Sequence, residues 1–249
     1  MTEIHIDISE KIYPGVGGAQ PHRAIEDLRI SLYSGEFVCL VGPSGCGKTT
    51  LLNIIAGLDK AFQGDIRLLH SQKPEPLVGY VFQEPRLLPW RTVRENIELA
   101  LHGNGTRDHE AVTSLLEALG LWQVEEKYPE RLSVGMRRRV ALARAFVIQP
   151  DLLLMDEPFV SLDAPAARSA RRLLIDVWRQ RPHTVLFVTH DLREAITLAD
   201  RLIFLGPSPT RVIHQMKVPL TRDLRGDEPA VEAFRHKLLS DYPAIKPLL

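Results

Sequence analysis

The sequence has 249 residues, of which 45% are hydrophobic and 25% charged, which excludes a disordered or collagen-like chain and provides material for a sizeable core. Basic and acidic side chains both number 31, so the formal net charge is zero and nucleic acid is not an expected partner. Two cysteines, no secretory leader and no apolar run near the roughly 18 residues of a membrane span predict free thiols in a soluble, cytoplasmic chain.

The first elements in chain order are two predicted strands with one buried face. Apolar and polar residues alternate over residues 4–8 and again over 28–32, and the two strands are expected to be antiparallel. Residues 14–21 between them are rich in Gly and Pro and predict a flexible loop.

A continuous apolar run over 37–41 predicts a buried strand, and residues 47–56 predict a helix that Gly57 ends. Short apolar runs of the same kind cover 78–82, 152–155, 185–189 and 202–205. Their repetition predicts an α/β fold, with a mostly parallel sheet covered by helices and an antiparallel β subdomain at the N-terminus.

Between residues 83 and 151 the strand pattern stops and helical patterns follow. A helix is predicted over 92–101 with a capping box of Thr92 and Glu95, a second over 111–119 ending at Gly120, and a third over 137–148. The chain is therefore predicted to be one domain, with a core of about 1–84 and 150–226, a helical subdomain of about 85–149, and a tail of about 227–249 with a helix over 231–239.

A phosphate-binding motif follows the predicted strand at 37–41. It has the P-loop pattern of a Gly, four residues, and Gly-Lys-Thr: Gly42, Pro43, Ser44, Gly45, Cys46, Gly47, Lys48 and Thr49. Such a loop turns backbone N–H groups towards an anion at a helix start, while Lys48 reaches the β and γ phosphates and Thr49 offers an oxygen to Mg²⁺. Thr50 is included with these residues as a predicted part of the nucleotide site, and a plain Gly-rich turn is the alternative.

Asp156 and Glu157 end the apolar run that begins at residue 152. In the presence of a P-loop, this arrangement predicts that Asp156 holds Mg²⁺ and that Glu157 is the general base that polarises the attacking water. On its own, an acidic pair after a strand is equally compatible with a surface turn.

The segment over 132–136, Leu-Ser-Val-Gly-Met, precedes a predicted helix, and taken alone its Ser133 would be an ordinary helix cap. The order of P-loop, Gln83, this segment, Asp156-Glu157, Asp163 and His190 resembles the nucleotide-binding subunits of ATP-binding cassette (ABC) transporters over roughly residues 4–215. The resemblance implies an ATPase in which Ser133 and Gly135 belong to a signature motif that contacts ATP bound to the opposite subunit.

The resemblance also implies roles for four further residues. Gln83 senses Mg²⁺ and the nucleophilic water, Asp163 lies at the dimer interface, and His190 contacts the γ phosphate. Tyr13 is similar to the aromatic residue that stacks on adenine. A structural histidine and a surface tyrosine are the respective alternatives for His190 and Tyr13.

Two features differ from the usual pattern or need another interpretation. Val134 and Met136 replace the third and fifth residues of the usual Leu-Ser-Gly-Gly-Gln, so the hydroxyl of Ser133 and the small Gly135 remain while the glutamine contact is lost. Arg137, Arg138 and Arg139 follow the motif, and three consecutive basic residues on a helix predict a solvated face rather than a nucleic-acid site.

The residues after Gln83 include Leu87, Leu88, Pro89 and Trp90, which resemble importers of the nitrate, sulfonate and taurine group. This likeness implies import of a small anion or sulfonate by a homodimer or paired cassette on the inner face of the cell membrane, through separate permease subunits that receive cargo from a solute-binding protein. The alternatives are a lipid or drug exporter and a non-transport ABC ATPase. The apolar cluster is predicted either to dock a membrane partner or to pack inside the helical subdomain.

Overall fold

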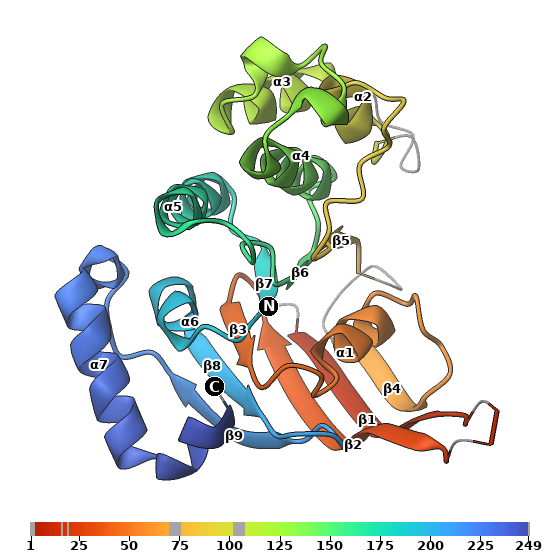
Figure 1. Ribbon diagram of the computed structural model, residues 1–249, viewed down its shortest axis with the longest axis vertical. Helices are drawn as coiled ribbons and strands as arrows, with labels where there is room; N and C mark the ends of the chain where they lie inside the picture. Colours follow the sequence, from red (N-terminus) through yellow and green to blue (C-terminus); the bar gives the residue numbers. More distant parts are fainter. Residues whose placement is uncertain (1–2, 16, 19, 70–75, 102–107, 249) are drawn as a thin grey trace. The chain divides into compact units, whose positions relative to one another are not determined.

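The computed structural model describes residues 3–15, 17–18, 20–69, 76–101 and 108–248 (Figure 1). The chain divides into two compact units, Met1–Glu75 with Thr184–Leu249 as the first and Pro76–His183 as the second. The predicted division into core, helical subdomain and tail stays a prediction.

The first unit contains an antiparallel sheet of three strands in the order β2-β1-β4 (Figure 1). Strands β1 (Glu3–Tyr13) and β2 (His22–Tyr33) confirm the two alternating patterns, because Ile4, Ile6 and Ile8 lie buried on one face of β1. The described residues between these strands, 14–15, 17–18 and 20–21, are in neither strand, whereas 16 and 19 lie outside the described residues.

Strand β4 (Gln63–Leu69) pairs with β1 and was not predicted. Its first residues, Gln-Gly-Asp, lack apolar alternation, so the pattern that marks a half-buried strand is missing there. Gly64 is required where β4 begins: its φ is +137°, and a Cβ atom at this position would lie 2.1 Å from the carbonyl oxygen of Asp7. This close approach of two backbones is a common reason for a glycine inside a strand.

The first unit also contains a buried parallel sheet in the order β7-β3-β8, with β9 antiparallel at its edge. The strands are β3 (Phe37–Val41), β7 (Thr184–Thr189), β8 (Arg201–Leu205) and β9 (Val212–Lys217). All residues of β3, β7 and β8 are buried, which explains their unbroken apolar runs. Strand β9 was not predicted, because its residues alternate only between half-buried and exposed.

The helices of the first unit are capped by side chains in two cases, at Asp191 and Asp227, whereas the helix that begins at Lys48 has no side-chain cap. They are α1 (Lys48–Ile55), α6 (Leu192–Leu198), α7 (Glu228–Asp241) and the 3-10 segments Leu224–Gly226 and Pro243–Leu248. The predicted helix at 231–239 is confirmed and is longer, since the Asp227 side chain accepts a hydrogen bond from the Ala230 backbone and starts α7 three residues earlier.

The second unit pairs β5 (Val78–Val81) with β6 (Leu152–Asp156) in parallel. Its helices are α2 (Val93–Glu98), α3 (His109–Ala118), α4 (Val134–Phe146) and α5 (Ala164–Gln180), with 3-10 turns at Trp122–Val124 and Pro129–Arg131. The capping box of Thr92 and Glu95 is confirmed. Gly120 adopts φ +64° just after α3, as expected for a residue that ends a helix.

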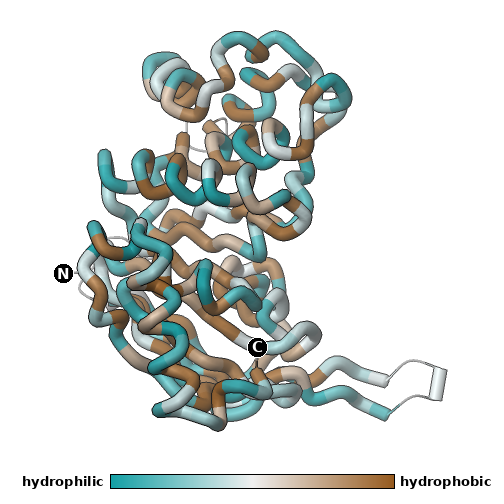
Figure 2. Tube along the Cα trace, turned by 60° about the vertical axis from the view of Figure 1, so that its left-hand side comes forward, coloured by the Kyte–Doolittle hydropathy of each residue, from teal (hydrophilic) through white to brown (hydrophobic). Residues whose placement is uncertain are grey.

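Figure 2 shows hydrophilic and hydrophobic residues alternating along the helical coils of the chain. In α5 the buried residues recur at helical spacing: Ala167, Ala170, Leu174, Val177 and Trp178. Among the residues that the structure describes, no helix combines the length and the apolarity needed to cross a bilayer. The arrangement is the predicted α/β class, with a parallel sheet, an antiparallel β subdomain and a helical segment.

Candidate functional site

The predicted phosphate-binding loop lies between β3 and α1 in the first unit (Figure 1). Gly45 and Gly47 adopt φ values of +76° and +103°, which glycine reaches without steric cost. The Lys48 ammonium is buried and donates to the carbonyl oxygens of Gly42 at 2.8 Å and Pro43 at 2.9 Å. The loop therefore curls around a lysine at the start of a helix, which is the geometry that presents backbone donors and positive charge to an anion.

The other residues of the motif differ in their exposure. Ser44, Gly45 and Thr49 are exposed, Pro43 and Thr50 are half-buried, and Gly42 and Cys46 are buried. A Cβ atom at Gly45 would meet nothing within 4 Å, so the outer side of the loop is open. Cys39 and Cys46 are both buried, and neither forms a disulfide, in agreement with the sequence prediction.

Thr210 contacts the loop at Cys46 and Gly47, and it was not predicted as part of the site. Its backbone N–H and its hydroxyl both donate to Ala24 O, at 2.8 and 2.9 Å, and the hydroxyl also contacts the Cys46 carbonyl oxygen. A Cβ atom at Gly47 would lie 2.5 Å from the Thr210 hydroxyl, so this position accepts only glycine. The signal was absent from the motif because Thr210 is far away in sequence.

Tyr13 lies beside the first turn of α1. Its hydroxyl is 3.2 Å from the Thr50 hydroxyl and 3.4 Å from an Asp59 carboxylate oxygen, and the Lys11 ammonium lies 4.5 Å from the centre of its ring. The side chain is 38% exposed. An aromatic face at the surface next to the loop is compatible with the predicted stacking of adenine.

His190 follows β7, at the carboxyl end of the parallel strands where the loop also begins. Val41 is paired in register with Thr189, so Gly42 and His190 are the next residues along two neighbouring parallel strands. His190 is exposed, and behind it Asp191 caps α6 by accepting from the Arg193 backbone at 2.9 Å. The loop, Tyr13 and His190 all belong to the first unit. Tyr13 contacts Thr50 of α1, and His190 follows the strand that pairs with β3.

In the second unit, Gln83 and the acidic pair lie at the carboxyl ends of the paired strands β5 and β6. Val81 is paired in register with Met155, Gln83 follows two residues later, and Asp156 ends β6. Burial and the nearby Asp156 carboxylate raise the pKa of Tyr80, whose ring stacks on Phe82 at 4.0 Å. Asp156 is buried and Glu157 adopts φ +42°, a left-handed conformation that turns the chain immediately after the strand.

The predicted signature residues form the start of α4. Ser133 is exposed and accepts from the Met136 backbone at 3.2 Å, so it is a helix cap, and α4 begins at Val134 instead of the predicted Arg137. A Cβ atom at Gly135 would meet nothing within 4 Å, so nothing in this chain requires a glycine there. Asp163 likewise caps α5 by accepting from Ala166 at 3.0 Å. Capping and a surface role in a complex are compatible at both residues.

Residues 25–160 match the family model for the ABC transporter. The chain belongs to the ABC transporter family. It is 42% identical over 220 residues to an aliphatic sulfonates import ATP-binding protein of Burkholderia cenocepacia, covering 88% of this chain and 81% of that protein. It is 37% identical to the Bacillus subtilis protein of the same description, covering 96% and 94%, and 39% identical to a nitrate import ATP-binding protein of Synechococcus elongatus, covering 95% and 88%.

The solved structure of the ATP-binding cassette MJ0796, a dimer in a post-hydrolysis state with ADP and phosphate, is also similar. Its TM-score is 0.74 at 29% sequence identity, and the match covers 89% of this chain and all of that one. The predicted ABC fold is confirmed, and this chain is an ATP-binding subunit with the ATPase activity of its family.

The apolar cluster after Gln83, formed by Leu87, Leu88 and Trp90, lies at the surface of this ABC subunit. Trp90 is 69% exposed, whereas Leu87 and Leu88 are half-buried. The fully buried Asn96 accepts from the Leu88 backbone at 2.8 Å and donates to the carbonyl oxygens of Leu88 and Arg91 at 3.1 and 3.0 Å. The alternative that Trp90 packs inside the helical subdomain is therefore wrong.

The prediction of a solvated arginine face is wrong for Arg138 of the ABC subunit. Its side chain is only 8% exposed and donates to main-chain carbonyl oxygens, whereas Arg137 and Arg139 are half-buried. The prediction failed because neighbouring residues of a helix point in different directions. A run of charges therefore does not reveal which side chain turns inward.

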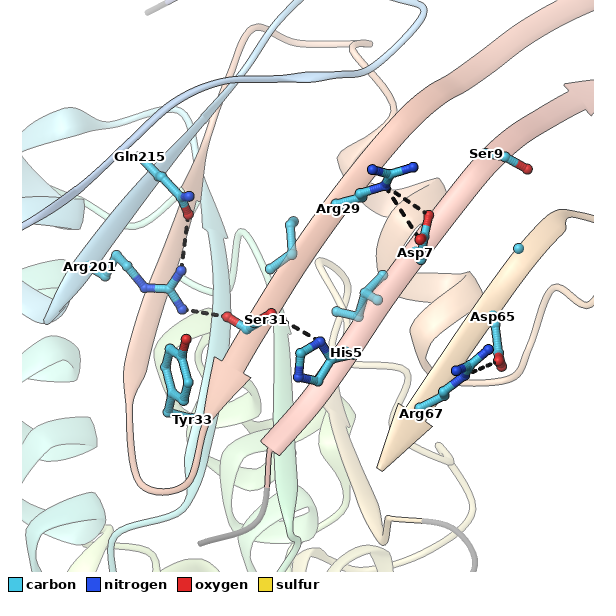
Figure 3. A pocket seen from close by; sticks show the side chains of 13 residues that line it. His5, Asp7, Ser9, Arg29, Ser31, Tyr33, Asp65, Arg67, Arg201 and Gln215 are labelled. Carbon is cyan, nitrogen blue, oxygen red and sulfur yellow. Dashed lines mark hydrogen bonds and ion pairs between the residues drawn. The ribbon is translucent and has the colours of Figure 1, made fainter. Parts of the chain in front are cut away.

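A separate hollow of 820 Å³ lies on the outward face of the antiparallel sheet of the ABC subunit (Figure 3). Asp7 pairs with Arg29 at 3.4 Å, Asp65 pairs with Arg67, and Arg201 donates to the Ser31 carbonyl oxygen at 2.6 Å. Arg201 also pairs with Glu36 at 2.7 Å, and none of the predicted nucleotide residues lines this hollow.

The predicted magnesium ligands of this ABC subunit are Thr49, Gln83 and Asp156. Among the described residues, no group of three or more His, Cys, Asp or Glu side chains could hold a metal ion. The exposed Thr49 beside the open phosphate-binding loop is the donor expected for Mg²⁺ that is shared with phosphate oxygens. The residues present therefore fit a metal that arrives with ATP.

Proposed function

We propose that Gly42–Thr49, together with Thr50 and Tyr13, binds the ATP that this ABC subunit hydrolyses. The observation that carries the proposal is the loop geometry, in which two left-handed glycines curl the backbone around the buried Lys48. Backbone N–H groups and Lys48 bind the phosphates, and Tyr13 supports the adenine ring. Thr49, Gln83 and Asp156 would hold Mg²⁺, which would neutralise charge on the phosphate oxygens.

Glu157 is proposed as the general base of hydrolysis. Its carboxylate accepts a proton from the attacking water, Gln83 orients that water, and His190 donates a hydrogen bond to the γ phosphate. The strand registers support this proposal. In the first unit, neighbouring parallel strands lead into the loop and into His190. In the second unit, neighbouring parallel strands lead towards Gln83 and Glu157.

A second copy, or a paired cassette, is proposed to complete each ATP site. Ser133 and Gly135 would contact ATP on the opposite subunit, and Asp163 would lie in the same interface. Two observations support this arrangement: the exposed start of α4 has open space beside Gly135, and the similar MJ0796 cassette is a dimer. A glycine in the first turn of a helix costs about 1 kcal/mol relative to alanine, so a close partner is a reason to keep it.

The transported solute is proposed to be a small anion of the sulfonate or nitrate type. The similar proteins are import subunits for aliphatic sulfonates and nitrate, which favours import over the alternative of lipid or drug export. The chain would bind permease subunits on the inner face of the membrane through Leu87, Leu88 and Trp90. Cargo would reach the permease from a solute-binding protein.

Disulfide formation between two differently tagged chains tests the composite site. One chain carries Ser44→Cys in the phosphate-binding loop and the other carries Ser133→Cys, both with Glu157→Gln to retain ATP. We expect an ATP-dependent crosslink between the tags, with little background because both native cysteines are buried. The matched control replaces Ser133→Cys with Ser169→Cys, an exposed serine on α5. Equal crosslinking of the control, or none with Ser133→Cys, would contradict the sandwich dimer.

A further inference from the structure

The guanidinium of Arg138 connects two separate segments of the second unit to helix α4. One terminal nitrogen donates to Gln83 O at 3.2 Å and to Pro158 O at 2.5 Å, and the other donates to Val160 O. Gln83 follows β5, whereas Pro158 and Val160 follow β6. One side chain of the helix that begins at the signature motif therefore holds the chain after both strands.

Arg138 is unusual because its positive charge is buried and faces carbonyl groups. Burial lowers the pKa of the Arg138 guanidinium, and among the described residues no acidic side chain forms an ion pair with it. An arginine stays protonated at neutral pH, and its planar fork of donors can serve several acceptors at once. A buried cation without an acidic partner is costly, so its bonds to three carbonyl oxygens are needed to retain it.

The backbone held by Arg138 is conformationally strained. Glu157 at φ +42° precedes Pro158, and Ser161 at φ +67° follows Val160, and neither residue is glycine. Such left-handed residues cost about 1 kcal/mol or more each and persist where surrounding contacts hold them. Two of the three Arg138 acceptors, Pro158 and Val160, lie between these two residues, so the bonds oppose relaxation of the turn that carries Glu157.

A second arginine of α4 holds the continuation of the Gln83 segment. Arg144 donates to Pro85 O at 2.7 Å and to Arg86 O at 2.8 Å, and Arg86 adopts φ +46°. Burial also lowers the pKa of Arg144. The segment 83–86 is thus fixed to α4 at two places, but only Arg138 also reaches the segment 158–160.

We infer that Arg138 is a positioning residue that couples the Gln83 segment and the Glu157 turn to the signature helix. The inference rests on the proposed roles of Gln83 and Glu157 in hydrolysis. Because one guanidinium serves both segments, a displacement of residues 83–86 changes the bonds that hold residues 158–160. A change at the exposed Trp90, which follows this segment along the chain, can therefore reach the general base without passing through the phosphate-binding loop.

The test compares Arg138→Met, Arg138→Lys and the control Arg137→Met, which removes the same charge one residue earlier on α4. We expect Arg138→Met to lower kcat by about tenfold or more while the KM for ATP changes by less than about threefold. Amide hydrogen exchange over 83–86 and 157–162 should accelerate by about tenfold, with α3 unchanged. Arg138→Lys should fall between Arg138→Met and the native chain, because one ammonium replaces only part of the fork. Arg137→Met should match the native chain.

Unchanged exchange in both segments would overturn the inference, as would equal acceleration throughout the unit, which is the result of a general loss of stability. An unchanged kcat in Arg138→Met would also overturn it, provided that Glu157→Gln abolishes hydrolysis in the same assay. If Glu157→Gln retained full hydrolysis, the proposed catalytic role would fail instead. The exchange measurement would then still decide whether Arg138 holds the two segments.

Discussion

The phosphate-binding loop and the segments around Gln83 and Glu157 are held by different kinds of contact. Lys48 donates to carbonyl groups five and six residues away, within the motif itself. Arg138 and Arg144 reach carbonyl groups 55 and 59 residues away, at Gln83 and Pro85. The Lys48 contacts are therefore local, and Thr210 is a distant support of the same loop, whereas the second region depends on side chains from a distant helix.

This difference separates the expected effects of substitution. Changes in the second region, other than at the proposed Mg²⁺ ligands Gln83 and Asp156, should alter hydrolysis, stability or docking while leaving ATP affinity nearly intact, because Lys48 and the phosphate-binding loop lie in the first unit. Loss of ATP affinity from a substitution in the second region would break this comparison.

The largest effect is expected from Glu157→Gln, which keeps the side-chain size but removes the basic carboxylate. The rate of ATP hydrolysis should fall by about 10² to 10⁴, as for the loss of a general base, while ATP still binds. Steady-state phosphate release and equilibrium ATP binding measure the two quantities. Glu110→Gln, at an exposed acid on α3, is the control and should retain native turnover. Near-native hydrolysis by Glu157→Gln would refute the assignment.

Asn96→Leu should destabilise the second unit by about 2 to 4 kcal/mol, because Asn96 is fully buried and the Leu88 N–H and several carbonyl oxygens lose their partner. Urea denaturation measures the free energy of unfolding, and Gln123→Leu, at an exposed amide, serves as the control. A loss below about 0.5 kcal/mol, within the range of ordinary surface substitutions, would mean that other contacts hold the apolar cluster.

Trp90→Ala should weaken assembly with the membrane subunits by roughly 2 kcal/mol, as for an interface anchor, without changing the stability or ATP affinity of the free subunit. Trp122→Ala is a close control, since Trp122 is 58% exposed and Trp90 is 69% exposed. ATPase activity and solute uptake, measured side by side in reconstituted vesicles, report coupling. Equal effects of the two substitutions would argue against docking through Trp90.

The smallest effect concerns His183 at the end of the second unit. Burial and the nearby Arg181 charge lower the pKa of His183, so the folded state favours the neutral ring. Its stability contribution is present above the unfolded pKa of about 6.5 and is lost as pH falls towards the lower folded pKa. The His183→Asn variant should lose less stability than the native chain between pH 7.5 and 5.5. The difference should be below about 1 kcal/mol after solvent screening, measured by thermal unfolding.

The patterns that sequence reasoning interpreted correctly are local. The strand before Gly42, the helix after Gly47 and the capping box at Thr92 each depend on residues within a few positions, so their spacing carries the signal. The P-loop belongs to this class as well, because its glycines and Lys48 shape one another directly.

The features that only the tertiary structure decided are contacts between distant residues. The sequence by itself determined the α/β class and the order of the motifs, but it did not reveal β4 or β9, whose apolar patterns are weak, nor the support of Gly47 by Thr210. In the sequence Arg138 cannot be distinguished from Arg137 and Arg139, and only the fold shows that carbonyl oxygens surround its side chain. Burial of a charge is decided by acceptors that folding brings from far along the chain, and no local spacing records where those acceptors will lie.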